Sequence, residues 1–164
     1  MRRKRQPIPH ERLEAELRAS GHSLICGMDE VGRGAWAGPL VVGAVILPPD
    51  HQIHHLRDSK LLTRLERERI ARRIKGVALS WAIGIVEVEE LNYWGLGQGL
   101  SVAAARAVAA LNPQPTLILI DGKYPFRDLP IPQHPVIRGD QTVRAIAAAS
   151  VAGVNAPASR SFPP

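Results

Sequence analysis

The sequence is poor in cysteine, in aromatic residues and in long apolar runs. Cys26 is the single cysteine of 164 residues, so an intramolecular disulfide is excluded. Because it lies in an apolar segment, we expect a packed thiol rather than a nucleophile. No apolar run reaches the roughly 18 residues that a membrane-spanning helix requires, and no signal-peptide core follows the N-terminal basic residues. These absences predict a soluble, cytoplasmic protein with no membrane partner.

Acidic residues are also scarce, and none follows Asp140. Lys and Arg number 21 against 15 Asp and Glu, which gives a formal net charge of +6 and a pI near 10.2. This balance favours a polyanionic partner, although charge alone does not separate nucleic acid from an anionic membrane surface. The basic cluster Arg2-Arg3-Lys4-Arg5 has two interpretations, an arm that touches phosphates or a solvated tail.

The pattern of apolar and turn residues predicts alternating strands and helices. Residues 77–85 alternate large apolar and small side chains, the period of a strand with one strongly apolar face. Thr63-Arg64-Leu65-Glu66 fits a capping box that opens a helix reaching Gly76. The remaining predicted elements are helices at 11–19, at 100–111 and from Gln141, and strands at 24–28, 40–47, 116–120 and 136–137. No internal repeat is evident, so the elements fit one α/β fold, a central mixed β-sheet flanked by helices.

Two carboxylates stand together in the segment Asp29-Glu30-Val31-Gly32-Arg33-Gly34. The apolar run before them predicts a short buried strand, so Asp29 is expected where this strand ends and side chains face a cleft. Adjacent strand residues point to opposite faces, and only a kink or a strand end would bring Asp29 and Glu30 to one ion. A solvated turn is the simpler alternative for an isolated Asp-Glu pair.

Asp121 is a third candidate for metal chemistry. It follows the buried strand predicted at 116–120, and the carboxyl end of a strand is where α/β enzymes place their chemistry. A turn residue before Gly122 is the alternative interpretation. Carboxylate oxygens suit Mg²⁺, and two such ions can activate water and stabilise the leaving oxygen in phosphodiester hydrolysis.

Several motifs follow one another in a fixed order from about residue 24 to residue 150. They are Gly27–Gly34 with Ala37–Leu47, Asp58–Thr63, Ile120–Gly122, and Gly139–Asp140 with Ala145–Ser150. Together they resemble the type 2 ribonucleases H, specifically bacterial ribonuclease HII. The resemblance implies a ribonuclease H-like fold. It also implies an endoribonuclease that cuts RNA in RNA/DNA hybrids, or at ribonucleotides embedded in duplex DNA, and leaves a 3′-hydroxyl. A monomer is expected.

The resemblance also assigns the metal site. Asp29, Glu30 and Asp121 match three family carboxylates, which implies that they are catalytic and bind Mg²⁺ or Mn²⁺. Asp29 and Asp121 are expected to be the principal ligands. Glu30 is expected to hold one ion or its water.

Substrate binding is assigned to a second set of residues. Gly32 and Gly34 permit close approach of a sugar, whose 2′-hydroxyl distinguishes RNA from DNA. Arg33 can bind a phosphate through its planar guanidinium group. Lys60 matches a family position near the substrate backbone. A surface lysine before a helix cap is the alternative for Lys60.

The resemblance ends after Ser150. The family pattern implies a following lysine and an Arg-Asp pair whose aspartate is a fourth metal ligand, but this chain has Ala158 or Pro157 at that place. We expect the later family helices to be missing, including a tyrosine that helps to read the RNA-to-DNA junction, as after a frameshift or truncation. Asp140 is expected to be a helix N-cap rather than a replacement ligand.

Two functional classes therefore stay open. One is a ribonuclease H type 2 enzyme, and the other is a catalytically impaired homologue that only binds nucleic acid. Activity in this chain would mean that Asp140 or a solvent-held ion completes the site.

We divide the chain into a basic N-terminal arm and helix at 1–22, a ribonuclease H-like catalytic domain at 23–152 and an atypical Pro/Ser-rich tail at 153–164.

Overall fold

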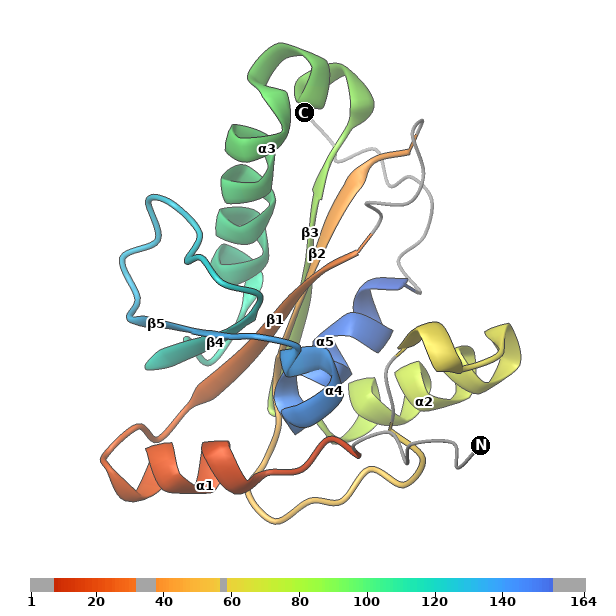
Figure 1. Ribbon diagram of the computed structural model, residues 1–164, viewed down its shortest axis with the longest axis vertical. Coiled ribbons are helices and arrows are strands. Elements are labelled where there is room, and N and C mark those ends of the chain that lie inside the picture. Colours follow the sequence, from red (N-terminus) through yellow and green to blue (C-terminus); the bar gives the residue numbers. More distant parts are fainter. Residues whose placement is uncertain (1–7, 32–37, 57–58, 155–164) are drawn as a thin grey trace, which may run out of the picture.

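The computed structural model describes residues 8–31, 38–56 and 59–154. These residues form a five-stranded sheet with helices on both faces (Figure 1). The strands are β1 (Ile25–Val31), β2 (Leu40–Ile46), β3 (Ser80–Val86), β4 (Leu117–Asp121) and β5 (Gln133–Val136). The helices are α1 (Arg12–Ala19), η1 (Ser59–Leu61), α2 (Arg64–Val77), α3 (Val88–Ala110), α4 (Gly139–Thr142) and α5 (Arg144–Val154).

The sheet is mixed, as predicted, with the order β3-β2-β1-β4-β5. β1 pairs antiparallel with β2 and parallel with β4, while β2 pairs antiparallel with β3 and β4 pairs parallel with β5. The three strands β1, β4 and β5 therefore run in the same direction. Their carboxyl ends lie at one edge of the sheet, which is where open α/β sheets bind ligands.

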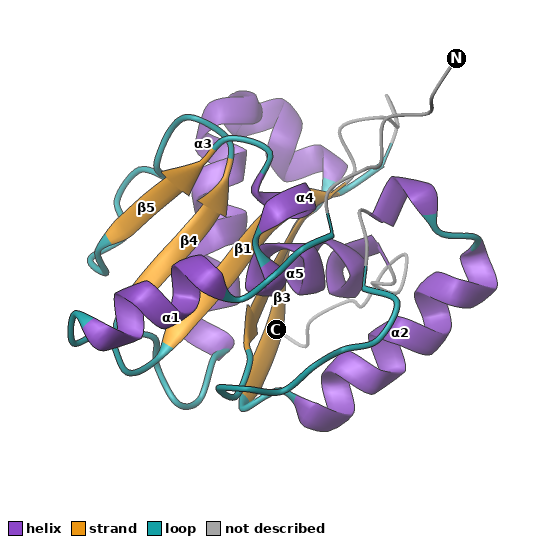
Figure 2. Cartoon of the chain, turned by 60° about the horizontal axis from the view of Figure 1, so that its bottom comes forward, coloured by secondary structure: helices purple, strands orange, loops and turns teal. Residues whose placement is uncertain are grey.

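Glycines on the sheet allow two helices to approach it closely. On one face, a Cβ at Gly27 would overlap the backbone of Ala145 in α5, and a Cβ at Gly43 would overlap the carbonyl oxygen of Ala149. On the other face, a Cβ at Gly84 would overlap a carbonyl oxygen of α3. Figure 2 shows α1, α4 and α5 on one side of the sheet and α3 on the other. None of the helices among the described residues combines the length and the apolar character that crossing a bilayer requires.

Several predicted elements are confirmed. The capping box of α2 is present in both directions, because Glu66 N donates to Thr63 Oγ1 and Thr63 N donates to Glu66 Oε2. The alanine-rich helix forms the second half of α3, whose first half is set off by a kink at Gly95, with φ 75°. Cys26 is free and fully buried, and this burial raises the pKa of its thiol to about 12.

The strand predicted at 77–85 is present, but its predicted start is wrong. Val77 ends α2, and β3 begins at Ser80. α3 covers the face with the small residues, Gly84 among them, because only small side chains admit a helix so close. Trp81 lies on the other face, is 38% exposed and has Lys75 Nζ 4.3 Å from its ring centroid.

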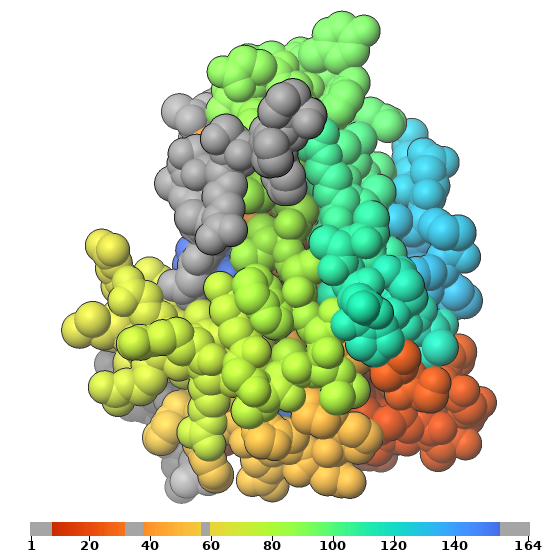
Figure 3. Space-filling model, turned by 180° about the vertical axis from the view of Figure 1, so that it is seen from behind, coloured from red at the N-terminus to blue at the C-terminus, as the bar shows by residue number. Residues whose placement is uncertain are grey.

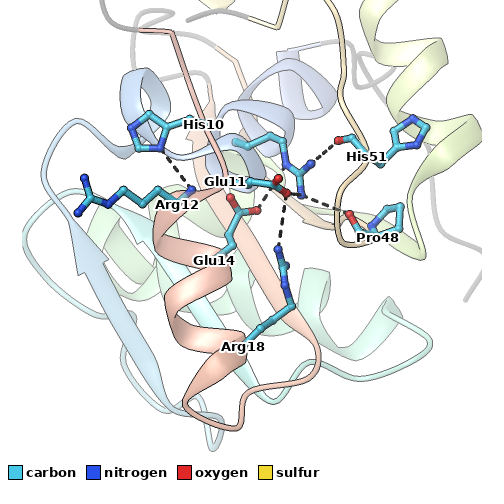
Figure 4. Close-up of polar contacts among 8 residues, drawn as sticks. His10, Glu11, Arg12, Glu14, Arg18, Pro48 and His51 are labelled. Carbon is cyan, nitrogen blue, oxygen red and sulfur yellow. Dashed lines mark hydrogen bonds and ion pairs between the residues drawn. The ribbon is translucent and has the colours of Figure 1, made fainter.

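A buried arginine fastens α1 to the start of α5. Arg144 Nη2 lies 3.1 Å from Glu11 Oε2, and Arg144 Nε lies 3.9 Å from Glu14 Oε1. The same guanidinium donates to the carbonyl oxygens of Pro48 and His51. Figure 4 shows the carboxyl groups of Glu11, the residue before α1, and of Glu14 lying between this helix and the loop that carries Pro48 and His51. The cluster thus joins α1, this loop and the first turn of α5.

Candidate active site

An open pocket of about 790 Å³ lies at the carboxyl ends of β1 and β4. Four carboxylates from three elements line it: Asp29 and Glu30 of β1, Asp121 of β4 and Asp140 of α4. Lys60 of η1 lines it as well. The structure therefore brings together four of the predicted site residues and adds Asp140 to them.

β1 is longer than predicted, which changes how its two carboxylates are placed. Asp29 and Glu30 lie within the strand, opposite Gly43 and Val42 of β2, and not beyond its end. Successive strand residues alternate between faces, so Asp29 lies on the face covered by α5 and Glu30 on the opposite face. Both line the pocket because it opens around this edge of the sheet.

Asp29 is the most buried carboxylate of β1, at 8% exposure. Burial, with smaller contributions from the nearby charges of Asp121 and Asp140, raises the pKa of its carboxyl group from 3.8 to about 7. A hydrogen bond from the Ser150 side chain opposes this rise. A nearby positive charge would therefore favour the ionised form of Asp29 at neutral pH.

Asp121 connects the end of β4 to α4. Its Oδ1 accepts a hydrogen bond from Gly139 N at 2.7 Å and a longer one from Asp140 N at 3.5 Å. Gly122 follows with φ 115°, a conformation that glycine adopts without strain, so the chain turns away directly after the carboxylate. Asp121 thus caps the first turn of α4 while its side chain faces the pocket.

The prediction that Asp140 is a helix N-cap is wrong. The N-cap of α4 is Arg138, in the left-handed conformation, and Asp140 belongs to the first helical turn. Its side chain is buried at the pocket, and Lys60 Nζ lies 3.9 Å from Asp140 Oδ2. The helix predicted from Gln141 is in fact two helices that meet at Val143.

Asp140 and Ser150 are the site residues that sequence reasoning missed. A signal for Asp140 was present, since it follows the predicted strand at 136–137 as Asp121 follows its own strand. If these two strands are parallel neighbours, both carboxylates must emerge at the same edge of the sheet. The predicted substrate segment Gly32-Arg33-Gly34 lies outside the described residues, as do the basic cluster at 2–5 and residues 155–164.

The donor set suits a hard divalent cation. All four acidic side chains offer carboxylate oxygens, which Mg²⁺ and Mn²⁺ prefer to sulfur ligands. Within the described ranges, no three acidic, histidine or cysteine side chains are grouped closely enough to enclose an ion by themselves. This spacing still fits Mg²⁺, because that ion is usually held by one or two carboxylates and keeps several waters.

Solved structures with the same arrangement identify the class of fold. The ribonuclease H2 from Pyrococcus horikoshii OT3 matches 80% of this chain and 70% of its own, with a TM-score of 0.69 and 21% identity. The ribonuclease HII of a PCNA complex from Archaeoglobus fulgidus matches with a TM-score of 0.64 and 24% identity, over 80% of this chain and 71% of its own. A ribonuclease HIII described as a Mn²⁺ complex gives a TM-score of 0.63 at 24% identity, over 80% of this chain and 50% of that one. The fold is that of the ribonucleases H.

Sequence comparison narrows this class to one family. The family model described as Ribonuclease HII matches residues 26–155. The ribonuclease HII of Caulobacter vibrioides is 44% identical over 133 residues, which are 81% of this chain and 63% of that protein. The one from Nitrosococcus oceani is 42% identical over 127 residues, or 77% of this chain and 63% of that protein. The chain belongs to the ribonuclease HII family, and it spans about 63% of the length of these relatives.

Proposed function

We propose that this chain is a divalent-metal-dependent endoribonuclease that cuts RNA in RNA/DNA hybrids and at ribonucleotides embedded in duplex DNA. The observation that carries the proposal is the set of four carboxylates from β1, β4 and α4 that line one pocket in a member of this family. A polyanionic substrate also suits the net charge of +6. The proposal includes action as a monomer in the cytoplasm.

Each carboxylate has a proposed role. Asp29, Asp121 and Asp140 hold Mg²⁺ or Mn²⁺, and Glu30 holds an ion or orients the attacking water from the other face of β1. Bound divalent ions supply charge stabilisation at the attacking and leaving oxygens of the phosphate. The relative described as a Mn²⁺ complex supports the choice of metal.

Two neighbouring side chains keep this cluster in place. The Ser150 hydroxyl donates to Asp29 and favours its ionised, ligating form. Lys60, with an exposed side chain near Asp140, balances part of the negative charge and contacts the substrate backbone. Recognition of the 2′-hydroxyl by Gly32, Arg33 and Gly34 belongs to the same proposal.

A cleavage assay on a labelled duplex with one ribonucleotide tests this function. We expect Mg²⁺- or Mn²⁺-dependent cutting at the ribonucleotide and no cutting of the all-DNA duplex. Asp29→Asn and Asp121→Asn each remove an anionic ligand while keeping its shape, so the rate should fall about a hundredfold or more. Melting curves should stay close to that of the parental protein, because asparagine keeps the shape of aspartate and, at position 121, its Oδ1 still accepts the bonds from α4.

The same assay distinguishes the proposed nuclease from the alternative, a homologue that only binds nucleic acid. Tight binding of the duplex with no metal-dependent cleavage by the parental chain would select a homologue that only binds nucleic acid. Either asparagine variant cutting at the parental rate would remove that residue from the proposed site.

A further inference from the structure

The segment between β4 and β5 carries three side chains of nucleic-acid-binding type at the rim of the carboxylate pocket. Lys123, Tyr124 and Arg127 all line this pocket, and all three are exposed. Tyr124 is 80% exposed, although tyrosine normally buries much of its ring. The segment begins two residues after Asp121, so its cations lie next to the proposed site of cleavage.

The backbone of this segment is fastened at its centre. Phe126 is buried in the core beneath α3, and the Gln133 side chain bonds both its N at 2.8 Å and its O at 3.0 Å. Arg127 N donates to Ser101 Oγ of α3 at 3.2 Å. Figure 3 shows the light-blue part of this stretch at the edge of the molecule, beside α3. Because Phe126 and Gln133 fix the backbone, the exposed side chains on both sides of Phe126 are held at the rim.

The two cations on this rim are not neutralised by an acidic side chain of the described part of the chain. Within the described residues, neither Lys123 nor Arg127 forms an ion pair, whereas exposed arginines on α1 and α2 pair with a glutamate four residues away. Four carboxylates in the pocket repel a phosphate chain, so cations flanking them offset this repulsion. An exposed aromatic ring between two unpaired cations is the combination that binds a nucleic-acid strand by stacking and phosphate contact.

We propose that Lys123 and Arg127 bind phosphates that flank the scissile phosphate, and that Tyr124 packs against a sugar or base of the same strand. This inference rests on the proposed function and adds a second set of substrate contacts, on the β4–β5 segment. The β4–β5 segment would then hold the nucleic-acid strand next to Asp121. The three side chains are substrate-binding residues and take no part in proton transfer.

Fluorescence anisotropy with a ribonucleotide-containing duplex, without divalent metal, measures this binding apart from cleavage. The double variant Lys123→Ala/Arg127→Ala should bind about tenfold or more weakly, and the slope of log K against log salt should fall by about two. Tyr124→Ala should weaken binding about fivefold or more, whereas Tyr124→Phe should keep parental affinity.

The matched control removes two exposed charges away from the pocket, in Arg69→Ala/Arg73→Ala of α2. It should weaken binding about twofold or less. An equal loss of affinity in the control and in Lys123→Ala/Arg127→Ala would overturn the inference. A loss of affinity that comes with a lowered melting temperature would overturn it as well. If the parental chain itself binds no duplex, the proposed function fails and this inference with it. If Lys123→Ala/Arg127→Ala and Tyr124→Ala bind the duplex as tightly as the parental chain, this inference is overturned while the proposed function stands.

Discussion

Glu14 shows how the surroundings of one residue set its ionisation. It is 2% exposed, and burial raises the pKa of its carboxyl group from 4.5 to about 7 in spite of the nearby Arg144. Arg144 Nε is 3.9 Å away, and within the described residues Glu14 Oε2 has no hydrogen-bond partner. The Arg144 guanidinium also contacts Glu11 and the carbonyl oxygens of Pro48 and His51, so it compensates only part of the desolvation of this carboxylate.

The raised pKa predicts a pH-dependent stability. Between about pH 4.5 and pH 7 the folded protein holds a proton that the unfolded chain releases, so the free energy of unfolding falls as pH rises. The contribution of Glu14 is full below pH 4.5 and lost above pH 7. Glu14→Gln should remove the contribution of Glu14, which amounts to about 3 kcal/mol over the whole window, while the raised pKa of Asp29 leaves a smaller pH dependence of the same sign in the variant. Urea unfolding at pH 5 and pH 8 measures it.

Glu16→Gln is the control for this experiment. Glu16 lies on the same helix, carries the same charge and is exposed beside Arg12. The control should retain the parental pH profile. A parental profile in Glu14→Gln would show that the buried carboxyl does not set the pH dependence of stability.

At the scale of single residues, the local sequence indicates Asp29 and Asp121 clearly but Asp140 only weakly. The first two directly follow strongly apolar runs, which indicate buried strands, although Asp29 lies within β1 rather than at its end. Asp140 follows a weakly marked strand and precedes polar residues, a pattern equally typical of a helix cap. Only the pairing of β5 with β4 brings it to the pocket.

Among the elements, α5 depends most on glycine in the sheet. Its residues from Arg144 to Gly153 are all buried, and its backbone lies directly on Gly27 and Gly43. The helix can lie this close because its own side chains facing the sheet are mostly alanine. The same approach brings Ser150 to Asp29.

Gly27→Ala should therefore destabilise the protein strongly. The added methyl group would overlap backbone atoms of Ala145 and Ile146, which cannot rotate away, so we expect a loss of about 3 kcal/mol or more. Gly76→Ala is the matched control, because its methyl group would meet open space near the end of α2. That substitution should leave stability unchanged or raise it by up to about 1 kcal/mol. Denaturant midpoints distinguish the two, and a mild effect of Gly27→Ala would contradict the close packing.

Elements with strong local signals could be predicted from the sequence. The capping box fixed the start of α2, and apolar runs located β1, β2 and β4 to within a few residues. The face that β3 buries could not be predicted, because alternation alone does not show that α3 selects the side with Gly84. The end of β1 could not be predicted either, since Asp29 and Glu30 interrupt the apolar run and only their pairing with β2 keeps them in the strand.

For the whole molecule, topology assembles the site. β1 and β4 are separated by more than 80 residues in the sequence, yet they are parallel neighbours and end at the same edge. The expectation that this chain lacks a fourth carboxylate followed from counting residues after Ser150. The pocket contains a fourth carboxylate, Asp140, placed there by the parallel pairing of β5 with β4.

The central claim is that Asp140 completes a four-carboxylate metal site in this chain. Its most direct test compares the rate of Mn²⁺-dependent cleavage of a ribonucleotide-containing duplex by the parental protein, Asp140→Asn and Asp128→Asn. Asp128→Asn removes the same charge at an exposed position that does not line the pocket, and asparagine tolerates the φ of 59° found there. We predict that the parental protein and Asp128→Asn cut at similar rates, while Asp140→Asn is at least about a hundredfold slower. Equal rates for Asp140→Asn and the parental protein, or no cleavage by the parental protein, would contradict the claim.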